Sequence, residues 1–211
     1  MKKYILCIVL VMWMLVNFTF AIDYDFDKVS DAWLSRNNDL RMDLWLNQYK
    51  YDSKLNITAN KWSEHMSELW TWTHKRENTD WFYNYNSIWK RFADRWLVFD
   101  NVNRTTYTEN VWVWYVNCKQ EECTNEVIKA IKTTRNMYIW EAKYGWAHYR
   151  SLINKNFRII WLGLYINAKN KYYLTIHYWT KIKNISESKI TSEIPKIKQI
   201  NINELDKLSI N

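Results

Sequence analysis

The chain has four histidines, whose imidazole rings titrate near neutral pH and can also bind metals. His65 falls in a helical pattern and is interpreted as a surface residue, while His177 falls in an alternating strand pattern and is interpreted as structural. Ser151 follows His148 by three residues, one helical turn, but we do not expect it to be a nucleophile. The sequence shows no serine or cysteine with a committed base.

Two cysteines remain once the N-terminal segment is set aside. Cys118 and Cys123 flank the sequence Lys-Gln-Glu-Glu. In an exported chain they would close a small loop as a disulfide, and the alternative is two free thiols. The sequence places no histidine beside them at ligand spacing, which argues against a structural zinc site.

The N-terminus predicts export. Two lysines follow Met1, residues 4–20 form an uncharged apolar run, and Ala21 ends a small-residue cleavage pattern. We interpret residues 1–21 as a signal peptide, which gives a secreted or cell-surface location. The run is also just long enough for an uncleaved anchor, which would then be the chain's contact with a membrane.

The composition is unusual because the chain has 15 tryptophans and only 2 glycines. Glycine normally makes up roughly 7% of a protein. Our hypothesis is that UGA codons, read as glycine by the organism, are written here as tryptophan. Glycine would turn four segments into plausible turns or close approaches: 68–74, 109–115, 159–165 and 143–149. Trp62 lies in a helical pattern and could be a true core residue. The alternative is an aromatic-rich protein that binds carbohydrate or a partner.

The formal net charge is +8, two of these charges lie in the signal segment, and the other lysines are scattered among acidic residues. We therefore expect no nucleic-acid partner. Residues 180–211 are polar, lack aromatics and contain the only proline, which predicts a weakly ordered tail. The remaining body, residues 25–179, has the length of one domain.

Periodicity predicts an α+β fold with helices first and a hairpin last. Asp27 or Ser30 is the expected N-cap of the first helix and Thr124 that of a later one. The expected helices cover residues 29–41, 56–69, 83–93, 124–139 and 147–153, and the expected strands cover 111–116, 157–166 and 172–178. Residues 167–171 would form the hairpin turn.

Ordered motifs along residues 29–178 resemble the CAP superfamily of cysteine-rich secretory, antigen 5 and pathogenesis-related proteins. The motifs are Asn38 to Arg41, Trp45-Leu46, Asp52 to Leu55, the helix with Ala59 and Trp62, Glu109-Asn110, His148 to Ile153, Trp161 to Leu164 and Tyr172 to Tyr178. Members typically have Gly-Leu at the second motif and Gly-x-Gly at the seventh. The animal and plant disulfide set is absent, as in a compact bacterial-type member. The resemblance implies a three-layer α-β-α sandwich, with residues 25–179 as the CAP (SCP-like) domain.

The resemblance also implies a cleft with two histidines and two glutamates. They match His74, Glu109, His148 and Glu141, with Glu126 as a fallback for the last. Two imidazoles, His74 and His148, can share a divalent metal such as Zn²⁺, while the carboxylates fix their tautomers. Without metal, a Glu beside a His could position water for base catalysis. Three functions stay open: binding of a small ligand, lipid or extracellular protein; a metal- or His/Glu-dependent hydrolase of peptides or cell wall; and a surface adhesin. Whether the protein is an enzyme is left open.

Overall fold

The computed structural model describes residues 22–51, 56–75, 105–119 and 122–180. In order, the elements are α2 (Phe26–Asp43), β1 (Lys50–Tyr51), α3 (Asn56–Glu68), β2 (Tyr107–Tyr115), α5 (Thr124–Trp140), the 3₁₀ turn η2 (Glu141–Tyr144), α6 (Ala147–Ile153), β3 (Ile159–Ile166) and β4 (Lys171–Trp179). The predicted signal peptide, the predicted helix at 83–93 and the tail from 181 lie outside the described residues. The α+β class is confirmed.

The four strands form one mixed sheet in the order β1-β3-β4-β2. β1 runs parallel to β3, whereas β4 is antiparallel to both β3 and β2. The predicted hairpin joins β3 to β4, and Asn170 takes the left-handed conformation at its turn. β2 is an edge strand along its whole length. Segments of the chain can therefore pass around this edge and contact β2 from either face of the sheet.

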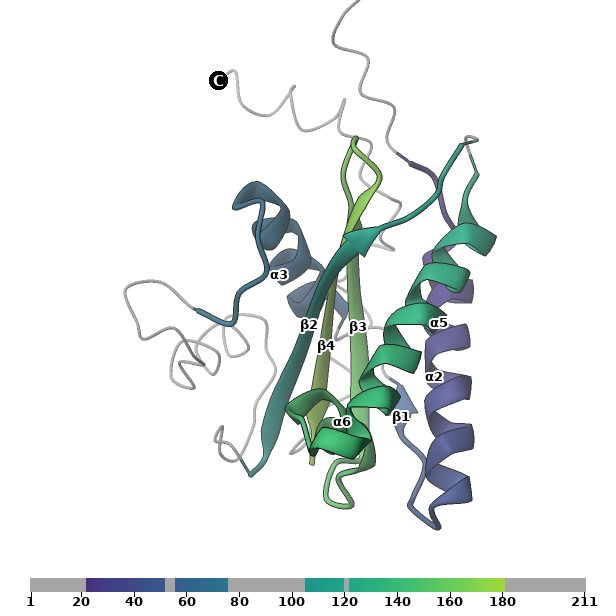
Figure 1. The fold of residues 1–211 in the computed structure, drawn as a ribbon, viewed down its shortest axis with the longest axis vertical. Coiled ribbons are helices and arrows are strands. Elements are labelled where there is room, and N and C mark those ends of the chain that lie inside the picture. The colour runs from purple at the N-terminus through teal and green to yellow at the C-terminus, as the bar shows by residue number, and fades with distance from the viewer. Residues whose placement is uncertain (1–21, 52–55, 76–104, 120–121, 181–211) are drawn as a thin grey trace, which may run out of the picture.

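Helices cover both faces of this sheet (Figure 1). Side chains alternate across a strand, so β3 and β4 contribute to two cores. Val29, Trp33, Val127, Ile131 and Leu152 of α2, α5 and α6 share one buried cluster with Ile160, Leu162, Leu174 and Ile176. Trp62 and Met66 of α3 pack on the other face, against Val111 and Tyr173. The arrangement is the three-layer sandwich that the sequence motifs implied.

The helix α3 lies directly on the sheet because Gly163 has no side chain. A Cβ at this position would overlap the backbone of Ala59 and Asn60. The Ser63 hydroxyl, on the next turn of α3, lies 3.1 Å from the Gly163 carbonyl oxygen, which accepts from it, and 2.9 Å from Thr175 Oγ1. The close approach and these bonds fix α3 against β3 and β4.

Two predicted N-caps are wrong. The first helix is capped by Asp25, whose carboxylate accepts from the Lys28 N–H at 3.0 Å, so the helix begins earlier than the apolar periodicity indicated. Cys123 is the N-cap residue of α5 and its side chain makes no capping hydrogen bond, whereas the Thr124 hydroxyl accepts from the Asp25 N–H at 2.7 Å. The predicted disulfide between Cys118 and Cys123 is present, with Cα atoms 5.7 Å apart.

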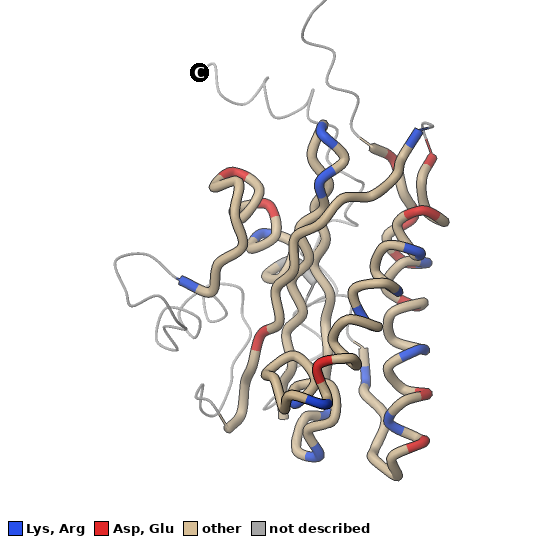
Figure 2. Tube along the Cα trace, in the orientation of Figure 1, with Lys and Arg blue, Asp and Glu red and all other residues tan. Residues whose placement is uncertain are grey.

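Charged residues of both signs alternate along α2 (Figure 2). Asp27, Asp31 and Asp39 are exposed on this helix, with Lys28 between the first two. Within the part of the chain that the structure describes, no helix combines the length and apolar character needed to cross a bilayer.

Candidate functional site

Glu109 and Asn110, consecutive on the edge strand β2, point to opposite faces of the sheet. Glu109 lies opposite His177 of the neighbouring strand β4. Its side chain faces the α3 side of the sheet, where the carboxylate accepts from His74 Nδ1 at 2.9 Å. The Asn110 amide donates to the His148 carbonyl at 3.3 Å on the α6 side. Two neighbouring residues of one motif thus hold the two histidine segments, one in each helical layer.

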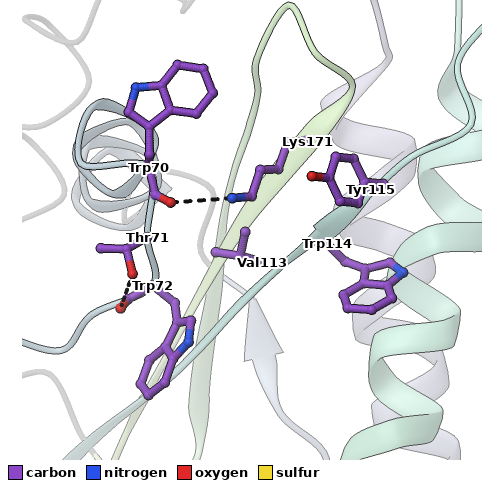
Figure 3. A pocket seen from close by; sticks show the side chains of 7 residues that line it. All are labelled: Trp70, Thr71, Trp72, Val113, Trp114, Tyr115 and Lys171. Carbon is purple, nitrogen blue, oxygen red and sulfur yellow. Dashed lines mark hydrogen bonds between the residues drawn. The ribbon is translucent and has the colours of Figure 1, made fainter.

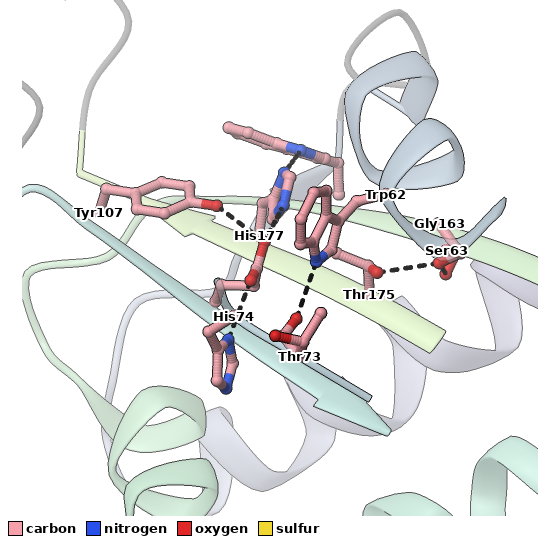
Figure 4. A network of polar contacts seen from close by, with 10 residues as sticks. Trp62, Ser63, Thr73, His74, Tyr107, Gly163, Thr175 and His177 are labelled. Carbon is pink, nitrogen blue, oxygen red and sulfur yellow. Dashed lines mark hydrogen bonds and ion pairs between the residues drawn. The ribbon is translucent and has the colours of Figure 1, made fainter. Parts of the chain in front are cut away.

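His74 lies in the loop that follows α3 (Figure 4). The loop is held by Trp62, whose indole N–H donates to the Thr73 carbonyl at 3.0 Å. Trp62 is itself buried, so this tryptophan has both a packing partner and a hydrogen-bond partner. The Glu109 side chain is fully buried, whereas the His74 side chain keeps 14% of its surface exposed. The carboxylate therefore orients an imidazole at the protein surface.

A second imidazole, that of His177, contacts the Glu109 carboxylate. His177 Nε2 lies 2.8 Å from Glu109 Oε2, and the Tyr107 hydroxyl donates to that oxygen at 3.3 Å. The indole N–H of Trp161 donates to His177 Nδ1. An indole can only donate, so His177 Nδ1 must accept and the ring proton sits on Nε2, directed at Glu109. The alternating pattern around His177 predicted only a structural strand residue, and no sequence signal linked it to Glu109.

The second histidine–glutamate pair lies where α5 ends. His148 Nδ1 is 2.8 Å from Glu141 Oε1. Glu141 opens η2 and His148 lies in the first turn of α6, and the chain reverses between them at Gly145 in the left-handed conformation. Glu141 is buried, and its second oxygen, Oε2, is buried without a hydrogen-bond partner among the described residues. A buried acceptor of this kind requires a donor from water or a ligand.

The His148 ring is enclosed by aromatic side chains. It stacks on Tyr138 with ring centroids 4.3 Å apart, and Trp112 meets it edge-on at 6.2 Å. Burial lowers the pKa of His148; Glu141 acts in the opposite direction and the nearby charge of His74 adds to the lowering. His148 is therefore neutral at pH 7. Its Nε2 has no hydrogen-bond partner among the described residues, which leaves a lone pair available to a ligand.

The structure brings the predicted site residues together in two pairs, His74 with Glu109 and His148 with Glu141. The fallback Glu126 lies in the first turn of α5, at the far end of that helix from Glu141. His65 forms a 3.4 Å surface pair with Glu68. The Ser151 hydroxyl donates to the Ala147 carbonyl at 3.0 Å, so it is held away from the role of nucleophile.

The donor set for a metal has two imidazoles and no third ligand among the described residues. No group of three or more His, Cys, Asp or Glu side chains in that part of the chain is arranged to hold a metal ion. The carboxylates of Glu109 and Glu141 bind the imidazole Nδ1 atoms, which is the place of second-shell groups in a histidine metal site.

A separate groove of about 310 Å³ lies at the other end of β2 (Figure 3). It is lined by Trp70, Thr71, Trp72, Val113, Trp114, Tyr115 and Lys171. None of the four predicted site residues lines this groove. It is the place where exposed aromatic residues could bind a ligand, as the alternative interpretation of the composition requires.

No protein-family model matches the sequence, and no curated protein sequence is significantly similar to it. The solved structures similar to this one include CAP domains, also called SCP domains. The predicted α+β class is confirmed, and these structures are of the type that the sequence motifs indicated.

Three of the similar structures are of bacterial proteins. The CAP domain of Enterococcal PrgA is 17% identical with a TM-score of 0.48, over 75% of this chain and 64% of that one. An outer surface protein of Borrelia burgdorferi is 15% identical with a TM-score of 0.49, over 74% and 96%. An extracellular SCP-domain protein of Bacillus anthracis is 16% identical with a TM-score of 0.47, over 74% and 41%, so this chain spans less than half of it.

Proposed function

We propose that this chain is a secreted or cell-surface protein of the CAP type that binds a small ligand through the imidazoles of His74 and His148. The observation that carries the proposal is the pair of His148 and Glu141. The imidazole is neutral and partly exposed, and its Nδ1 is hydrogen-bonded to the buried glutamate. Such a ring is a preformed hydrogen-bond acceptor. The buried Glu141 Oε2 beside it, which has no hydrogen-bond partner among the described residues, adds a second acceptor.

These groups favour a ligand that offers hydrogen-bond donors or a divalent cation. A carboxylate that fixes the tautomer of an imidazole also raises its basicity as a metal ligand. Zn²⁺ bound to the two histidines would leave positions for a donor atom of the ligand, and its chemistry would be to polarise that atom. Zn²⁺ alone is therefore the simplest probe of the site.

The test is calorimetric titration of the protein with Zn²⁺ at pH 7.5. We expect binding to the wild type and a loss of at least tenfold in affinity in His148→Ala and in His74→Ala, the range seen when a metal's ligand shell is damaged. His65→Ala is the matched control because His65 also pairs with a glutamate but lies on the surface of α3. Equal binding by the His148 variant and the wild type would contradict the proposal.

A hydrolase is the second candidate, favoured by the lowered pKa of His148. A histidine that is unprotonated at pH 7 and oriented by a carboxylate can remove a proton from water. Turnover of a peptide or cell-wall substrate that disappears in His148→Ala but persists in His65→Ala would select this function over ligand binding. Zn²⁺ binding with no turnover of any such substrate would leave the binding role.

A further inference from the structure

Three helical segments of this protein end in the same hydrogen-bonded turn, the Schellman motif. After α2, the Leu46 N–H donates to the Arg41 carbonyl at 2.8 Å and the Trp45 N–H donates to the Met42 carbonyl at 2.9 Å. After α3, Thr71 donates to Met66 at 3.2 Å and Trp70 donates to Ser67 at 3.1 Å. After η2, Trp146 donates to Glu141 at 3.4 Å and Gly145 donates to Ala142 at 3.1 Å. These are the paired bonds that define the motif.

The motif requires one residue in the left-handed conformation, and glycine is the usual residue there because a Cβ is disfavoured. Gly145 occupies this position after η2 with a φ of 64°. The equivalent positions after α2 and α3 hold Trp45 with a φ of 57° and Trp70 with a φ of 56°. Bulky residues are genuine outliers at such angles. Among the described residues, the only other non-glycine with positive φ is Asn170, a type that tolerates it.

The indole rings of Trp45 and Trp70 make few packing contacts that could offset this backbone strain. The Trp45 side chain is 96% exposed, so it contributes almost no packing. Trp70 is 54% exposed and its ring contacts the Lys169 ammonium at 4.6 Å, an exposed cation–π contact. The buried tryptophans are different: Trp62 and Trp161 lie in the core with their N–H groups hydrogen-bonded.

The geometry points to glycine at positions 45 and 70 of the protein as its own organism makes it, with UGA codons there read as glycine. This inference is independent of the ligand-binding proposal. It agrees with the amino-acid composition, in which tryptophan is in excess and glycine is nearly missing. It also has a consequence for the molecular surface: without the Trp70 ring, the groove of Figure 3 loses one of its aromatic walls. The groove of the natural protein would then be lined on that side by backbone rather than by an indole ring.

Peptide sequencing by mass spectrometry on protein from the native organism tests the inference directly. Trypsin releases residues 42–50 with Trp45 as the sole tryptophan, and residues 62–75 with Trp62, Trp70 and Trp72. We expect glycine at 45 and at 70, and tryptophan at 62, which serves as an internal control within the second peptide. Tryptophan at 45 and 70 in the native material overturns the inference.

A second test uses the stability of the recombinant chain. Trp45→Gly and Trp45→Ala both remove an exposed ring, but only the alanine keeps a Cβ in the left-handed region. We expect Trp45→Gly to melt about 2 to 4 °C above Trp45→Ala and above the tryptophan form. Trp140→Gly is the control: Trp140 is 46% exposed but helical, so glycine there should lower the melting temperature. Equal melting temperatures of the glycine and alanine variants at 45 would contradict the structural argument.

Discussion

At the residue scale, the environment of His148 sets two effects against each other. The stack on Tyr138 and the edge of Trp112 remove water from the ring, while Glu141 would stabilise its protonated form. Burial is the larger effect and the pKa of His148 is lowered. The ring is thus kept neutral even though a carboxylate touches it, which is the protonation state that ligand binding and base catalysis both need.

The lowered pKa makes the stability of the protein depend on pH. Below the ordinary pKa of about 6.5 the unfolded chain binds a proton on His148 before the folded chain does, so stability falls as the pH drops through the lowered pKa. We expect the urea midpoint, measured with a chelator present, to fall less steeply between pH 7 and pH 5 in His148→Gln than in the wild type. His65→Gln, on the surface, is the matched control. Parallel curves for the His148 variant and wild type would contradict the assignment.

At the scale of elements, the position of His74 depends on how closely α3 lies on the sheet. The loop that carries His74 starts where α3 ends, and its carboxylate partner is on β2. Gly163 permits the close approach, and Ser63 joins α3 to both Gly163 and Thr175. A displaced α3 would move His74 away from Glu109.

Gly163→Ala tests this contact because the new methyl group would overlap the α3 backbone. We expect the free energy of unfolding to fall by about 3 kcal/mol, at the upper end of overpacking effects. Gly145→Ala is the matched control: its Cβ would meet nothing within 4 Å, although its positive φ makes alanine cost about 1 kcal/mol. Urea denaturation measures both. If Gly163→Ala lowered the free energy of unfolding by no more than Gly145→Ala does, the prediction would be wrong, because α3 would then shift away from the new methyl group at little cost.

At the scale of the whole molecule, one buried arginine joins the beginning of the domain to its end. Arg41 of α2 donates to the Leu152 carbonyl at 3.0 Å, the Asn154 carbonyl at 3.1 Å and the Phe157 carbonyl at 3.2 Å. These carbonyls lie in the last turn of α6, which carries His148, and in the segment that leads from it to β3. The Arg-containing motif of the first helix is therefore a structural connection within one helical layer, between α2 and the chain around the end of α6.

Replacing this arginine would leave several buried carbonyls without donors. We expect Arg41→Met to lower the free energy of unfolding by about 3 kcal/mol or more. Arg150→Met, on the exposed side of α6, should change it by less than about 0.5 kcal/mol. Both are measured by urea denaturation monitored by tryptophan fluorescence. A small effect at Arg41 would mean that water replaces the lost donors.

Local signals predicted most of the elements. The 3.6-residue periodicity identified α2, α3, α5 and α6, and the alternation of apolar residues identified β3 and β4 to within two residues. The two-residue strand β1 was missed, because two residues carry no periodicity. The first N-cap prediction failed because α2 begins earlier than the apolar periodicity, at Asp25. The Thr124 hydroxyl does not cap α5 but accepts from the Asp25 N–H, a contact between residues 99 positions apart.

The sequence by itself determined the helices, the terminal hairpin and the order of the motifs, because these depend on residues close along the chain. It also held the composition that indicated misread glycines. Only the tertiary structure decided which carboxylate serves which imidazole: Glu141 rather than Glu126 for His148, and both His74 and His177 for Glu109. It also showed that, of the candidate positions, 45 and 70 have the left-handed backbone that favours glycine. These outcomes depend on strand register and backbone φ, which are fixed only when distant segments pack together.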